Sequence, residues 1–121
     1  MILSDAVEEY LCSKQHSITH DTRAWYTYHL DYLVRWCSQR QIKHVSEITP
    51  SLIQKAVSDH PRTNANTRHG FVQVVKGFLR WCSEDDDLGV RERTVKRIEL
   101  PKSVQPDASM MDPFVKTLGQ G

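Results

Sequence analysis

Cysteine is the most reactive residue type in this chain, and two of its three cysteines lie in identical surroundings. The tetrapeptide Arg-Trp-Cys-Ser occurs at residues 35–38 and again at residues 80–83. Such a pair could belong to a metal site or a redox pair, or it could mark two helices built to one pattern. No Cys-x-x-Cys sequence is present, and an odd number of cysteines is typical of reduced thiols. We therefore interpret the cysteines as small buried apolar residues rather than as metal ligands.

A second group of residues is suited to binding anions. Between residues 61 and 83 the chain has bases but no acidic residue. At 100° per residue, one side of a helix in this segment would carry Arg68, His69, Gln73, Lys76 and Arg80, with Val72 among them. The helix would start at the polar sequence TNANTR, whose amide, hydroxyl and guanidinium groups can donate to phosphate. This side predicts a surface for the major groove of DNA, and the alternative is an ordinary solvated face.

Acidic residues gather elsewhere in the sequence. Residues 1–10 contain three acids and no base, and residues 84–87 read EDDD. The net charge of +1 therefore conceals a polarised distribution.

The elements that would position these residues are all helical. Apolar residues recur at spacings of three and four, and no strand is expected. Helices are predicted from Ser4 or Asp5 onward, with Asp5 and Glu8 as a capping box, and over 21–39. Thr49 followed by Pro50 predicts the start of a third helix, and the fourth is expected over 66–84. Residues 91–100 are expected to form a last short helix or an extended segment.

The repeated tetrapeptide is explained by these helices. Residues 21–38 align with residues 66–83 at a constant offset of 45, with Asp21 and Asn66 as possible caps. The pairs that share the buried stripe are Tyr26 with Phe71, Leu30 with Val75, Leu33 with Phe78 and Trp36 with Trp81. The two helices are predicted to be long core helices of one pattern, with both tryptophans as packing anchors.

Length and composition set the remaining bounds. A chain of 121 residues with 39% hydrophobic and 26% charged residues has the size and composition of one ordinary globular domain. No apolar run is long enough to cross a bilayer, and the first residues do not resemble a secretory signal. A cytoplasmic location and no membrane partner are therefore expected. No nucleophile motif or glycine-rich phosphate loop accompanies the serines and tyrosines, and no cofactor is expected.

Several motifs occur in a recognisable order. They are Thr-x3-Tyr-x3-Leu-x2-Leu-x2-Trp from Thr22, then VSEITPSLIQKAV, NTRHGFVQVVKGFLRWC and IELPK. Together they resemble the N-terminal core-binding domain of the tyrosine recombinase or phage integrase family, over roughly residues 3–102. The resemblance implies an all-α, SAM-like bundle of four to five helices that clamps double-stranded DNA for integration or site-specific recombination.

The resemblance also implies roles for individual residues. Thr22 and Arg23 would hold phosphate at the start of the second helix. The residues implied for DNA contact at the fourth helix are Arg62, Asn64, Thr67, Arg68 and Lys76. Lys102 would mark the linker to a catalytic domain. With the polar side described above, the predicted DNA-binding set also includes His69, Gln73 and Arg80.

The same resemblance predicts the organisation of the parent protein. Residues 1–102 would form the DNA-binding domain, and residues 103–121 a linker or the start of a catalytic domain. No tyrosine or His-x-x-Arg sequence follows residue 102, so this chain is not expected to cleave DNA by itself. The expected partners are double-stranded DNA, the catalytic domain of the same parent and other recombinase protomers. The alternative is a helical protein-interaction module with an acidic partner, and a third possibility is a metal- or thiol-dependent enzyme.

Overall fold

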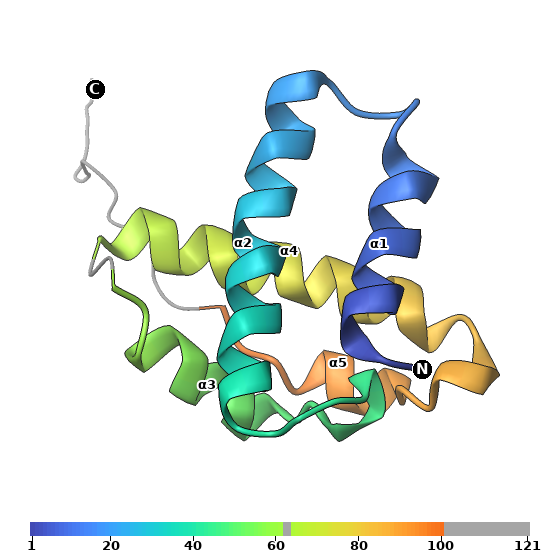
Figure 1. Ribbon diagram of the computed structural model, residues 1–121. Helices are drawn as coiled ribbons and strands as arrows, with labels where there is room; N and C mark the ends of the chain where they lie inside the picture. Colours follow the sequence, from blue (N-terminus) through green and yellow to red (C-terminus); the bar gives the residue numbers. More distant parts are fainter. Residues whose placement is uncertain (62–63, 101–121) are drawn as a thin grey trace, which may run out of the picture.

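Helix α4 (Ala65–Ser83) runs through the middle of the fold, because apolar residues recur around most of its circumference. It contacts each of the other helices, namely α1 (Leu3–Lys14), α2 (His20–Gln39), α3 (Pro50–Ser58) and α5 (Glu92–Lys96). In Figure 1, α1 and α2 lie side by side and cross α4, while α3 and α5 lie at its lower side. The other four helices are thus all packed against α4.

The computed structural model describes residues 1–61 and 64–100. Within these ranges the remaining regular elements are two 3-10 turns, η1 (Val45–Glu47) and η2 (Asp86–Leu88), and the only β-type pairing is an isolated bridge between Ile2 and His44. The predicted all-α bundle is confirmed. None of the helices in these two ranges is both long enough and apolar enough to span a lipid bilayer.

The core forms where the two repeated helices face each other. Leu30 and Leu33 of α2, and Phe71, Val75 and Phe78 of α4, are each at most 1% exposed. These are residues that the offset of 45 places on one stripe of each helix. Burying large apolar side chains from two facing stripes supplies the main stabilising free energy of such a bundle.

The repeated tryptophans and two of the cysteines pack as predicted. Trp36 is buried, and Trp81 is half-buried with its ring 5.5 Å from that of Tyr10. Burial raises the pKa of the Cys37 thiol to about 11 and that of Cys82 to about 12. Neither thiol is therefore a nucleophile at neutral pH.

Cys12 is exposed, so the prediction of burial was wrong for this cysteine. It follows Leu11 on α1, beside the buried stripe rather than within it. In residues 1–61 and 64–100, no group of three His, Cys, Asp or Glu side chains could hold a metal ion.

The start of α1 differs from the prediction. The helix begins at Leu3, and Ile2 occupies the cap position without a side-chain hydrogen bond, so the capping box of Asp5 and Glu8 is wrong. The Leu3 amide instead donates to the Lys43 carbonyl at 2.8 Å. Pairing with a distant segment satisfies an amide that a local side chain would otherwise have to satisfy.

The caps of the two repeated helices also lie two residues earlier than predicted. Thr19 caps α2 and Asn64 caps α4, in place of Asp21 and Asn66. The offset of 45 nevertheless holds, because Thr19 and Asn64 are themselves 45 residues apart. Thr49 caps α3 and Pro50 is its first residue, as predicted. Residues 92–96 form the helical alternative expected for the last segment.

Val72 was placed on the polar side of α4, and this placement was wrong, because Val72 is only 2% exposed. It lines a groove of about 320 Å³ with Ile53 and Val57 of α3 and with Ile98, which follows α5. The return of the chain after α5 therefore covers part of the face that periodicity assigned to solvent. Periodicity marks an apolar position but does not show which later segment will cover it.

Candidate nucleic-acid interface

The first turn of α2 places a threonine and an arginine beside a well-formed cap. The hydroxyl oxygen of Thr19 accepts a hydrogen bond from the Thr22 amide at 3.2 Å, and the Thr19 hydroxyl donates to the Thr22 oxygen at 2.9 Å. Arg23 is exposed and forms no ion pair with the residues that the structure describes. An uncommitted guanidinium at a helix start is well placed to bind an anion.

The first turn of α4 repeats this arrangement. The Asn64 side-chain oxygen accepts hydrogen bonds from the amides of Asn66 at 2.8 Å and Thr67 at 3.3 Å. Arg68 is half-buried, and its Nε atom is buried without a hydrogen-bond partner among the described residues. A buried donor without a partner is costly, and Arg68 occupies the same helical position in α4 as Arg23 does in α2.

The two first turns border one shallow depression. It has a volume of about 390 Å³ and is lined by Asp21, Ala24, Trp25 and Tyr28 from α2 and by Thr67 from α4. Figure 1 shows α2 starting at the top and α4 starting at the left. We refer to this place as the Trp25 depression.

An aromatic cluster lies beneath the Trp25 depression. The Trp25 ring is 4.2 Å from that of His29, and the Tyr28 ring is 5.0 Å from it. His29 is fully buried, and neither ring nitrogen has a hydrogen-bond partner in the described part of the chain. Burial lowers the pKa of His29 to about 4, and the nearby His60 adds to the shift. Both effects keep His29 neutral at pH 7.

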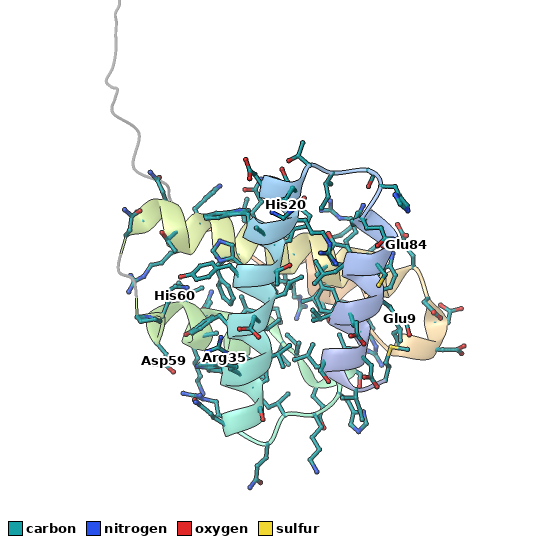
Figure 2. The ribbon with its side chains drawn as sticks, turned by 45° about the horizontal axis from the view of Figure 1, so that its top comes forward. Glu9, His20, Arg35, Asp59, His60 and Glu84 are labelled. Carbon is teal, nitrogen blue, oxygen red and sulfur yellow. The ribbon has the colours of Figure 1, made fainter. Side chains whose placement is uncertain are left out.

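Figure 2 labels charged and titratable residues from several elements of the fold. His20 lies at the start of α2, and His60 and Asp59 lie at the end of α3 on the left. Asp59 accepts hydrogen bonds from Trp36 at 2.9 Å and from Arg40 at 2.7 Å. Its carboxylate is therefore already committed, and these contacts fix α3 against the end of α2.

The other predicted residues of α4 lie along its length. Gln73 and Arg80 are exposed, and His69 is half-buried. Lys76 is also half-buried, and its Nζ atom donates to the carbonyl of Ile98 at 3.0 Å. Lys76 is thus engaged with the segment after α5 and lies apart from the first turn of α4. Arg62 and Lys102 fall outside the described residues.

The arrangement brings together five of the predicted residues and adds two that were missed. The five at the helix starts are Thr22, Arg23, Asn64, Thr67 and Arg68. Trp25 and Tyr28 were not assigned to the site from sequence, although they are 44% and 42% exposed. Their spacing of three residues, off the buried stripe of α2, was the available signal.

Comparison with known proteins agrees with this architecture. No family model and no curated protein sequence matches the chain. The structure is similar to a crystal structure of the N-terminal domain of a phage integrase/site-specific recombinase from Haloarcula marismortui, with a TM-score of 0.75 at 20% sequence identity. The match covers 84% of this chain and 97% of that one. The chain therefore has the all-α fold of an integrase N-terminal domain.

Proposed function

We propose that this chain binds double-stranded DNA through the first turns of α2 and α4, as the core-binding domain of a tyrosine-type integrase or recombinase. The observation that carries the proposal is the equivalence of the two first turns. In each helix a capping side chain is followed by a threonine at the third helical residue and an arginine at the fourth. Two such turns on one face can hold two phosphates of one duplex.

Electrostatics supports the same assignment. The whole of α4 contains no acidic residue, and the N-terminal ends of α2 and α4 each carry the positive end of a helix dipole. Phosphate contacts dominate the affinity of proteins for DNA, so a small number of well-placed bases is enough for weak binding. The similarity to an integrase N-terminal domain makes duplex DNA a better candidate than an acidic protein.

Within this proposal the chain contributes binding and positioning rather than cleavage. It would form one half of a clamp on duplex DNA, and a catalytic domain of the same parent would form the other half. Other recombinase protomers would bind neighbouring sites on the same DNA. The residues at the two helix starts would set the orientation of the chain on the duplex, because phosphate contacts fix register rather than sequence.

The proposal is tested by titrating labelled duplex DNA with the chain at several salt concentrations and measuring fluorescence anisotropy. We expect the affinity of the wild type to fall as salt rises. The double variant Arg23→Ala/Arg68→Ala should bind more weakly. The slope of log K against log salt should be shallower by about two units, because two phosphate contacts are lost.

Arg35→Ala is the matched control, because Arg35 is also an exposed arginine of α2 but pairs with Asp31. It lies about 18 Å further along the helix axis than Arg23, at 1.5 Å per residue. The control should bind DNA as the wild type does. If the double variant is folded and keeps the wild-type slope, the two helix starts are not the phosphate-binding surface.

A further inference from the structure

The Trp25 depression contains chemistry that phosphate binding does not explain. Its walls include two half-exposed aromatic rings and one carboxylate, that of Asp21. A carboxylate repels phosphate, and although the Trp25 indole N–H and the Tyr28 hydroxyl can donate hydrogen bonds, the apolar faces of their rings offer phosphate nothing to bind. Yet Arg23 and Arg68 are in the same two helical turns. A duplex held by those arginines would present something other than its phosphates to the depression.

Trp25 is also held in a fixed position. A Cβ atom added at Gly70 would lie 2.5 Å from Cζ2 of Trp25, so the indole rests directly on the backbone of α4. The perpendicular ring of His29 supports it at 4.2 Å. An aromatic ring that is immobilised before binding loses little conformational entropy when it contacts a partner. Nearly half of its surface remains exposed nevertheless.

The groups in the depression match the major-groove edge of an A·T base pair. That edge carries the thymine C5-methyl group, the adenine N6 amino donor and the acceptors adenine N7 and thymine O4. The rings of Trp25 and Tyr28 provide apolar surface for the methyl group. The Asp21 carboxylate can accept a hydrogen bond from the adenine amino group.

We propose that Trp25, together with Tyr28 and Asp21, reads an A·T base pair in the major groove between the two phosphate contacts, with the indole against the thymine methyl group. This inference rests on the proposed function and specifies what the same surface recognises. It assigns direct base readout to α2, whereas the arginines of both helices provide binding that is independent of sequence. The complementary charge of the two arginines is what selects DNA as the occupant of the depression.

The test begins with selection of duplexes from a random-sequence pool by the wild-type chain. The enriched duplex is then prepared in two forms, one with thymine and one with uracil at the selected A·T positions, which differ only in the C5-methyl group. We expect the wild type to bind the thymine form about fourfold more tightly, the factor that corresponds to burial of one methyl group.

Two variants test whether Trp25 is the source of this preference for thymine. In Trp25→Ala the ratio of the two affinities should fall to about one, while the dependence of binding on salt remains that of the wild type. Gly70→Ala keeps every aromatic and charged residue but displaces the Trp25 indole from its position against α4. This variant should also lower the ratio of the two affinities. Gly77→Ala is its control on the same helix, because a Cβ atom there would meet the Tyr10 hydroxyl at an ordinary 3.7 Å.

The possible results separate the inference from the proposed function. If no duplex is enriched, or if the wild type binds both forms equally, base reading by Trp25 is overturned without recourse to any variant. The same follows if folded Trp25→Ala keeps the fourfold ratio. Loss of salt-dependent binding in Arg23→Ala/Arg68→Ala tests the phosphate contacts independently. A chain that binds no duplex at any salt concentration would overturn both.

Discussion

His29 is one of two polar side chains that are buried in the described part of the chain. Its imidazole is fully buried among Trp25, Tyr28 and Phe71, and neither of its nitrogens is hydrogen-bonded within the described ranges. A buried imidazole strongly resists protonation, because the charged form would lose its hydration without gaining a partner. The aromatic cluster beneath the Trp25 depression therefore depends on a neutral histidine.

This dependence predicts a loss of stability in acid. The pKa of His29 is lowered from 6.5 to about 4 in the folded chain, so the unfolded chain binds more protons between these values. The stabilising contribution is complete above pH 6.5 and is lost as the pH falls toward 4, by about 3 kcal/mol in total. His29→Leu removes this titration. Urea unfolding at pH 7 and pH 4.5 should show a smaller loss of unfolding free energy in the variant.

The comparison between the two proteins removes the titration of His29 together with its electrostatic interaction with His60, while the carboxylates that titrate in the same range are common to both. At pH 7 the variant should be at least as stable as the wild type, since leucine leaves no unpaired nitrogen in the core. Equal losses between pH 7 and pH 4.5 would show that His29 does not contribute to the acid sensitivity.

The two long helices are the elements on which the candidate site depends. Each begins at a side-chain cap, and each carries its arginine at the fourth helical residue. A cap satisfies amides of the first turn and fixes the residue at which the helix begins. The caps therefore determine where Arg23 and Arg68 project, in addition to stabilising the helices.

Replacing the caps should lower stability in a position-dependent way. Thr19→Ala and Asn64→Ala should each reduce the free energy of unfolding by about 1 kcal/mol, because the first-turn amides that donate to these side chains lose their hydrogen-bond acceptor. Asn66→Ala provides the control within the same turn, since the Asn66 side chain does not cap the helix and alanine favours helix. Thermal unfolding followed by circular dichroism measures all three. A larger loss in Asn66→Ala than in Asn64→Ala would contradict the assigned cap.

The sequence predicted these elements well because long amphipathic helices have a strong periodic signal. The stripes containing Leu30, Leu33, Val75 and Phe78 are buried as expected. The caps were misplaced by two residues because Asp21 and Asn66 have suitable side chains, and side-chain type alone does not fix the backbone geometry of a cap.

The candidate site could be predicted only in part, for a different reason. The arginines and threonines were identified from their position in the repeat. The periodicity of a single helix could not predict the surroundings of Trp25 and Lys76, because these come from other segments. Trp25 packs against Gly70 of α4, and Lys76 donates to the carbonyl of Ile98. Contacts between distant parts of the chain are the information that local periodicity lacks.

At the scale of the whole molecule, the bases of α4, which extend from Arg68 to Arg80, are followed by an acidic run beyond the end of the helix. Its first turn carries Arg68, and the acidic run of residues 84–87 follows its last turn. Figure 2 shows Glu84 and Glu9 on the right of the molecule and His60 on the left. The two ends of α4 are about 28 Å apart at 1.5 Å per residue. The distance from the first turn of α4 to the acidic run is therefore well above the screening length of about 8 Å at physiological salt.

This separation predicts an effect of the acidic run that depends on salt. Asp86→Asn/Asp87→Asn should strengthen DNA binding by about twofold near 10 mM salt, where the screening length is about 30 Å. Near 150 mM salt the variant should bind as the wild type does. Anisotropy titrations at the two concentrations measure both affinities. A clear gain at 150 mM would place the acidic end close to the DNA.

The hydrogen bond from Lys76 to the Ile98 carbonyl links α4 to the segment that follows α5. The Lys76 ammonium has three donors, but an anion that moved it out of reach of that carbonyl would break this hydrogen bond, and in that case the two interactions would compete. By thermodynamic reciprocity, a ligand that favours the released ammonium loosens the segment around residue 98, and a segment held more firmly weakens that ligand by the same factor. One lysine would thus couple anion binding at α4 to the mobility of the segment around residue 98.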